Sequence, residues 1–140
     1  MMRNGRVVTM VLVSFLLIGT ALPARGDFSS GMEAYLLKDF DKALKEFMAD
    51  SDPRSFYQIG YMYDHAEGVP QDAKEAADWY RKAAEKGSLK AQYRMGVCYA
   101  NGYGVEKNTK EAAKWFRKAA SNGFQLAKDA LRRLESDRQP

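Results

Sequence analysis

Hydrophobic and small residues recur along most of the chain with the spacing of an α-helix. Tyr57, Gly60 and Tyr63 stand three positions apart, so they share one side of a helix. The same spacing returns further along, which predicts helices near 54–65 and 90–101. A glycine inside a helix costs about 1 kcal/mol relative to alanine, so its return in both helices predicts a neighbouring helix that approaches too closely for a side chain.

A shift of 36 residues aligns the chain with itself. Between residues 55–87 and 91–123, 15 of 33 aligned pairs are identical, and most of these are glycine, alanine or aromatic residues. Such residues serve packing, so the repeat is structural and predicts stacked units of one kind.

Each unit also predicts a second helix. Asp72 and Asn108 are its expected N-caps, and Gly87 and Gly123 are its expected C-terminal glycines. The apolar stripe of this helix consists of Ala76, Trp79, Tyr80, Ala83 and Ala84 in the first copy and of Ala112, Trp115, Phe116, Ala119 and Ala120 in the second.

These residues carry a family resemblance. Ile59-Gly60-x-x-Tyr63, Gly68-Val69, Asp72, Ala76, Trp79-Tyr80 and Lys82-Ala83-Ala84-x-x-Gly87, repeated from Met95 to Gly123, resemble the Sel-one-like repeat, a relative of the tetratricopeptide repeat. The resemblance implies an all-α fold, a short right-handed α-solenoid of about seven helices. The expected parts are a degenerate tetratricopeptide-like hairpin at 27–52, repeats at 53–88 and 89–123, and a capping helix with a tail at 124–140.

The first 26 residues predict a secretory signal peptide. Arg3 and Arg6 precede an apolar run from 7 to 22, and small residues follow it. We expect cleavage after Gly26, with cleavage after Ala24 as the alternative. An uncleaved membrane anchor is the other interpretation, although the run is shorter than the ~20 residues that a span needs. The domain is therefore expected outside the cytoplasm, periplasmic or secreted if the source is bacterial, with no membrane insertion after cleavage.

Removal of this segment changes the charge. The whole chain carries +4, but residues 27–140 hold 19 basic and 18 acidic side chains. Residues 27–72 carry a net −6 and residues 73–140 a net +7. A nearly neutral, polarised domain does not predict nucleic-acid binding. The asymmetry fits electrostatic orientation of a partner or head-to-tail self-association, and equally fits solvated helix faces with no partner.

Candidate catalytic chemistry is sparse. The chain has one cysteine, Cys98, and one histidine, His65, which rules out a disulfide within the chain and any metal site of several cysteines or histidines. Cys98 aligns with Met62, which predicts a packed and inert thiol. We therefore expect no catalytic residues, no metal and no cofactor.

Binding is the better expectation. In tetratricopeptide-like stacks the first helices line a concave groove, so the resemblance implies which side chains face it. These are Arg54, Tyr57, Tyr61, Asp64 and His65 in the first copy and Lys90, Tyr93, Val97 and Asn101 in the second. Tyr57 and Tyr93 recur in both copies and could instead serve packing between repeats.

The sequence thus predicts an exported, non-enzymatic adaptor or regulator that binds a protein partner, either a peptide or a helix, in a short concave groove. The alternative is a cell-envelope enzyme or an associated factor that acts on cell-wall material or beta-lactams. That analogy comes from cysteine-rich relatives, and the single Cys98 weakens it. A structural spacer in an envelope complex is the third interpretation.

Overall fold

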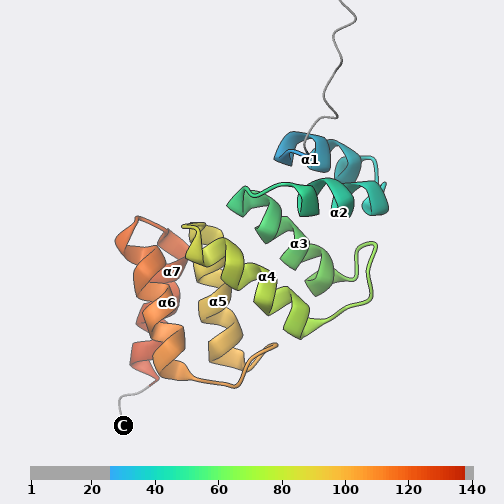
Figure 1. Ribbon diagram of the computed structural model, residues 1–140. Helices are drawn as coiled ribbons and strands as arrows, with labels where there is room; N and C mark the ends of the chain where they lie inside the picture. Colours follow the sequence, from blue (N-terminus) through green and yellow to red (C-terminus); the bar gives the residue numbers. More distant parts are fainter. Residues whose placement is uncertain (1–25, 138–140) are drawn as a thin grey trace, which may run out of the picture.

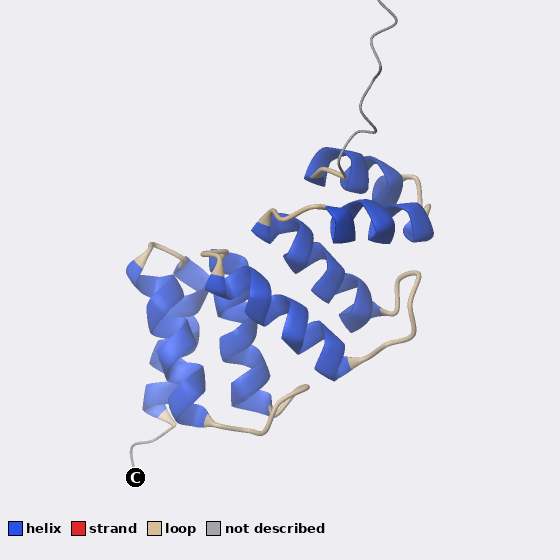
Figure 2. Cartoon of the chain, viewed as in Figure 1, coloured by secondary structure: helices blue, strands red, loops and turns tan. Residues whose placement is uncertain are grey.

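The computed structural model describes residues 26–137, and all of the regular structure in this range is helical (Figure 2). The helices are α1 (Phe28–Leu36), α2 (Phe40–Ala49), α3 (Pro53–His65), α4 (Ala73–Glu85), α5 (Leu89–Asn101), α6 (Thr109–Ser121) and α7 (Gln125–Ser136). The predicted all-helical class and the predicted number of helices are both confirmed for the described residues.

The helices form a stack of hairpins. Each helix contacts the next one along the chain, with the most extensive contacts inside the pairs α3–α4 and α5–α6. Figure 1 shows the hairpins following one another from α1–α2 at the top to α6 and α7 at the lower left. Neighbours in sequence are therefore neighbours in space, as a solenoid requires.

Local capping explains where the paired helices begin and end. The side chain of Asp72 accepts hydrogen bonds from the backbone at the start of α4, and Asn108 does the same for α6, as the sequence predicts. Gly87 and Gly123 adopt positive φ angles just beyond the ends of these helices. At the end of α3, Ala66 takes the left-handed conformation that Gly102 takes at the end of α5.

The glycines inside the first helices are where the hairpins close. A Cβ on Gly60 would lie 2.7 Å from the ring of Tyr80, and a Cβ on Gly96 would lie 2.4 Å from the ring of Phe116. A Cβ on Gly31 in α1 would likewise lie 2.4 Å from the ring of Phe47. In each hairpin an aromatic ring of the second helix fills the space that a side chain would occupy, which confirms the close approach expected from the sequence.

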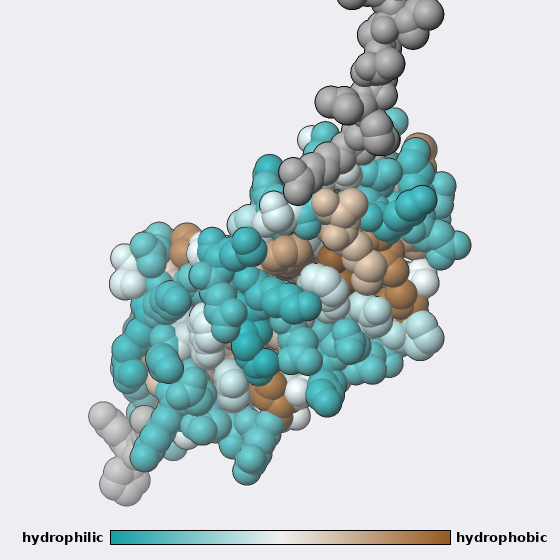
Figure 3. Space-filling model, in the orientation of Figure 1, coloured by the Kyte–Doolittle hydropathy of each residue, from teal (hydrophilic) through white to brown (hydrophobic). Residues whose placement is uncertain are grey.

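The core is built mainly from alanine, with a few large side chains between hairpins. Its buried residues fall into three clusters, of which the middle one is the largest. Tyr80, Phe47, Ile59, Met62 and Met95 are the largest side chains with almost no exposed surface. Figure 3 shows that the outer face is mostly hydrophilic over α4 and α6, whereas apolar atoms gather over α2.

The predicted signal peptide lies outside the described residues except for its last residue. Gly26 is buried against α2, and a Cβ there would lie 2.5 Å from the carbonyl oxygen of Glu46. Cleavage after Ala24 would keep this contact, and cleavage after Gly26 would remove it. Within residues 26–137 no helix is both long and apolar enough to cross a membrane.

Candidate binding groove

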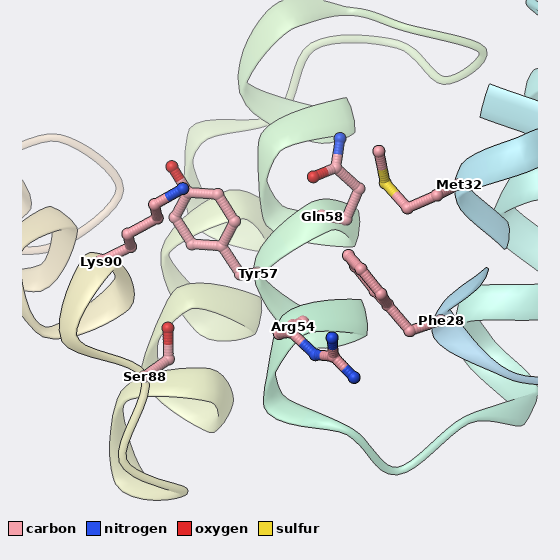
Figure 4. Close-up of a pocket in the computed structure, with 7 residues that line it drawn as sticks. All are labelled: Phe28, Met32, Arg54, Tyr57, Gln58, Ser88 and Lys90. Carbon is pink, nitrogen blue, oxygen red and sulfur yellow. The ribbon is translucent and has the colours of Figure 1, made fainter. Parts of the chain in front are cut away.

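The first helices of the three hairpins, α1, α3 and α5, line a series of hollows together with α7. The α1–α3 hollow, of about 240 Å³, is lined by Phe28, Met32, Arg54, Tyr57, Gln58, Ser88 and Lys90 (Figure 4). The α5–α7 hollow, of about 350 Å³, is lined by Tyr57, Lys90, Tyr93, Arg94, Phe124 and Leu126. Both are open to solvent and combine aromatic or aliphatic side chains with charged ones. Such a combination is typical of surfaces that receive side chains of a partner.

Two further hollows lie toward the C-terminal ends of the same helices. The Asp64 hollow, of about 230 Å³, is lined by Asp64, Tyr80, Arg94, Val97, Cys98, Asn101 and Tyr103. The α7 hollow, of about 290 Å³, is lined by Val97, Ala100, Asn101, Phe116, Ala130, Arg133, Leu134 and Asp137. Because neighbouring hollows share residues, together they follow the surface from α1 to α7.

Seven of the nine residues expected in the groove line at least one of these hollows. They are Arg54, Tyr57, Asp64, Lys90, Tyr93, Val97 and Asn101. The other two, Tyr61 and His65, line none of them. Their rings stack with centroids 3.8 Å apart, and His65 Nδ1 lies 3.0 Å from the carbonyl oxygen of Tyr61, so the structure pairs them with each other.

The two recurring tyrosines take part in packing as well as in the groove. The ring of Tyr57 lies 5.4 Å from that of Tyr80, and the ring of Tyr93 lies 5.7 Å from those of Phe116 and Phe124. Both tyrosines are half-buried. One side of each ring therefore supports the stack while the other contributes to a hollow.

Sequence reasoning missed several lining residues. Gln58 and Arg94 occupy equivalent positions of the two repeats, four residues after Arg54 and Lys90, so helical spacing could have found them. Phe28 and Met32 belong to the degenerate N-terminal hairpin, where the 36-residue alignment gives no guide. Phe124 and Leu126 lie at the start of α7. The 36-residue shift aligns them with Ser88 and Lys90, so extending the repeat register to Ala127 could have found them.

Positive charge gathers at the N-terminal ends of α3 and α5. Arg54 and Lys90 lie in the first turns of these helices, where no acidic side chain is found, whereas α4 and α6 carry Glu75 and Glu111 there. A cation in the first turn opposes the helix dipole at a cost of about 0.3–1 kcal/mol. At the start of α3 the N-cap Asp52 offsets the charge of Arg54, whereas at the start of α5 no acidic side chain offsets that of Lys90.

The two cations differ in their surroundings. The guanidinium of Arg54 forms a bidentate pair with the Asp52 carboxylate, at 2.7 Å for the closest contact, and lies 4.3 Å from the centre of the Phe28 ring. This hydrogen bonding lowers the pKa of Asp52. No hydrogen bond or ion pair joins the Lys90 ammonium to another of the described residues, and the side chain is exposed. Of these two cations, Lys90 is therefore the one without a competing acidic neighbour.

Asp64 stands in a network of its own. The buried Tyr80 hydroxyl donates a hydrogen bond to Asp64 Oδ2 over 3.1 Å, and Arg94 interacts electrostatically with both residues. Burial, and secondly the negative charge of Asp64, raise the pKa of Tyr80 far above its ordinary value. Burial likewise raises the pKa of Tyr103 to about 12. Asp64 is therefore a structural residue of the groove wall, where its carboxylate accepts the hydrogen bond of the buried Tyr80 hydroxyl.

Cys98 lies in the wall of the Asp64 hollow but is only 3% exposed. Burial, and then the charge of Asp64, raise the pKa of its thiol from 9.0 to about 11. A protonated thiol is a poor nucleophile at neutral pH. Among the described residues no group of three or more histidine, cysteine, aspartate or glutamate side chains is placed to hold a metal ion.

We expect the folded chain to resist alkylation at this thiol. The raised pKa alone lowers the thiolate fraction near neutral pH by about a hundredfold, and burial slows the reaction further. Iodoacetamide labelling at pH 8, followed by mass spectrometry, measures the alkylation rate of Cys98 with and without denaturant. Equal rates in the folded and the denatured chain would contradict the buried position of the thiol. Because the folded pKa is the higher one, the stabilisation from the neutral thiol is present below pH 9.0 and is lost as the pH rises through about 11.

The stacked hairpins define an α-solenoid, and a series of open hollows follows one of its surfaces. The sequence pattern of the Sel1 repeat matches residues 55–88 and 89–124. The chain belongs to the Sel1 repeat family, whose members are generally protein–protein interaction modules on a typically non-catalytic scaffold.

Solved structures agree with this family. A Sel1 repeat protein from Oxalobacter formigenes is 39% identical, with a TM-score of 0.72 over 75% of this chain and 44% of its own. A protective antigen of uropathogenic Escherichia coli strains, which displays an SLR fold, is 28% identical, with a TM-score of 0.71 over 78% of this chain and 25% of its own. This chain thus spans less than half of either protein.

A third structure supports the fold alone. The Helicobacter pylori cysteine-rich protein B is 22% identical, with a TM-score of 0.64 over 74% of this chain and 90% of its own. No curated protein matches the chain.

Proposed function

We propose that this protein is an exported, non-enzymatic adaptor or regulator that holds a peptide segment or a partner helix in the groove lined by α1, α3, α5 and α7. The export part of the proposal rests on the charged, apolar and small-residue pattern of residues 1–26. The binding part rests on the series of open hollows and on the side chains that line them.

The observation that carries the binding proposal is the exposed apolar surface inside the groove. Leu126 is 57% exposed and forms part of the same hollow as Tyr57, Tyr93 and Phe124. Large apolar side chains that remain open to solvent at a concave surface favour contact with a partner. Aromatic rings that are already fixed by packing give contact area at a small loss of side-chain entropy.

Photo-crosslinking tests which face is used. Benzoylphenylalanine is placed at Gln58 or Leu126 in the groove, or at Lys74 or Lys110 on the outer helices, in the full chain expressed in its own cells. We expect the groove positions to give the same crosslinked partner band in the cell-envelope fraction, with little product from the outer positions. All four positions are solvent-accessible or line an open hollow, so the variants should fold alike.

The opposite pattern would refute the groove. Crosslinks only from Lys74 and Lys110 would place the partner on the outer face. Crosslinked product confined to the cytoplasmic fraction would refute export. Hydrolysis of cell-wall fragments or beta-lactams by the purified chain would overturn the non-enzymatic assignment.

A further inference from the structure

The α1–α3 hollow and the α5–α7 hollow meet at a shared wall. Tyr57 and Lys90 are the two residues that line both. Figure 4 shows Phe28 and Met32 on one side of Tyr57, and Lys90 extending toward the Tyr57 ring from the other side. The surface therefore consists of two hollows that contain large apolar side chains, with Arg54 in the wall of one, Arg94 in the wall of the other and Lys90 between them.

Each hollow has the size for one large side chain. Their volumes of about 240 and 350 Å³ lie respectively below and just above the low end of the ~300–1,000 Å³ range of pockets for drug-sized ligands. The first is walled by Phe28, Met32 and Tyr57, and the second by aromatic rings with the exposed Leu126 at its edge. Apolar side chains of a partner would find complementary surface in both.

The charge between the hollows has one sign. No aspartate or glutamate lines either hollow. Arg54 is already paired with Asp52, and Arg94 interacts with the Asp64 network, whereas Lys90 has neither constraint. Lys90 also lies in the first turn of α5, where the partial positive charge of the helix terminus adds to its own. A carboxylate is the complement of this position.

We propose that the groove takes a linear peptide segment in which one acidic side chain stands between two large apolar side chains. The carboxylate pairs with Lys90, and the apolar side chains fill the α1–α3 and α5–α7 hollows. This inference rests on the proposed function and specifies the chemistry of its partner. A nucleic acid fits less well, because its affinity depends on many phosphate contacts. Of the three cations in these two hollows, Arg54 and Arg94 already interact with Asp52 and Asp64.

A matched peptide series tests this chemistry. The probes are short, capped, fluorescein-labelled peptides with glutamate between two leucines or two phenylalanines at several spacings, and identical peptides with glutamine or lysine in its place. Fluorescence anisotropy on the full chain measures affinity. For the best spacing we expect the glutamate peptide to bind about fivefold more tightly than the glutamine peptide, the upper size for one exposed ion pair.

Charge variants at Lys90 assign the effect. Lys90→Gln should abolish the preference for glutamate, and Lys90→Glu should shift it to the lysine peptide. Lys110→Gln is the matched control, because Lys110 is the second residue of α6 as Lys90 is of α5, is likewise exposed, and lines none of the hollows described. Circular dichroism of each variant confirms that it folds.

The outcomes separate this inference from the proposed function. Equal affinity for the glutamate and glutamine peptides, a preference that persists in Lys90→Gln, or no binding by any peptide would overturn the inference. If the photo-crosslinks from Gln58 and Leu126 still identify one partner, the groove stands and only its partner chemistry is wrong. Tighter binding of a single-stranded oligonucleotide, with a steep salt dependence, would also overturn it.

Discussion

Gly104→Ala should destabilise the folded chain by about 3 kcal/mol, the largest effect that we expect from removing any turn glycine. Two causes act together. Gly104 has a φ of +67°, which costs about 1–2 kcal/mol for a residue with a side chain. A Cβ there would also lie 2.0 Å from the carbonyl oxygen of Ala73, and overpacking against fixed backbone adds about 1–3 kcal/mol.

Gly87→Ala provides the control for this prediction. Gly87 also has a positive φ, of +97°, but a Cβ there would have no neighbour within 4 Å. We expect a loss of about 1–2 kcal/mol, from the backbone conformation alone. Urea denaturation of both variants, followed by helical circular dichroism, measures the difference. Equal losses would mean that the turn before α6 does not rest against α4.

These glycines show how far the sequence predicts the fold. The 36-residue spacing and the local motifs predict the helices and their caps, because such features depend on nearby residues. The contact of Gly104 with Ala73 is different. It joins the turn after α5 to the start of α4, and its counterpart joins Gly68 to Phe40 at the start of α2. Only the stacking of whole hairpins brings those positions together.

The sequence likewise predicts the part of the groove that depends on helix register. The alignment of the two repeats identifies Arg54 with Lys90 and Tyr57 with Tyr93, because register within a helix determines which side it faces. It could not show that Tyr61 turns to stack on His65, since that contact depends on side-chain geometry at the end of α3. It also could not supply the wall contributed by α1, whose sequence departs from the repeat.

Asp64→Ala should destabilise the folded chain by about 2 kcal/mol, because Asp64 is a structural residue of the groove wall. The Tyr80 hydroxyl, on a residue that is 1% exposed, would lose the carboxylate that accepts its hydrogen bond. A buried donor without an acceptor costs about 1–3 kcal/mol. Arg94 would lose a nearby negative charge at the same time. Urea denaturation measures the loss.

Asp129→Ala is the control, since Asp129 forms an exposed pair with Arg132 on the surface of α7. We expect it to change stability by about 0.5 kcal/mol or less. If the two variants were equally stable, Asp64 would be free to act as a partner contact, as its place in the sequence first indicated.

The second repeat naturally lacks both members of the hydrogen bond between Asp64 and Tyr80. Where the first repeat has Asp64 and Tyr80, the second has Ala100 and Phe116, so the acceptor and the hydroxyl are absent together. Removal of both members of a buried hydrogen bond can be nearly neutral, whereas removal of one is not. Asp64→Ala in a Tyr80→Phe background should therefore cost about 1 kcal/mol less than Asp64→Ala alone. Identical losses in the two backgrounds would show that the hydrogen bond does not contribute to stability and would assign the effect to Arg94.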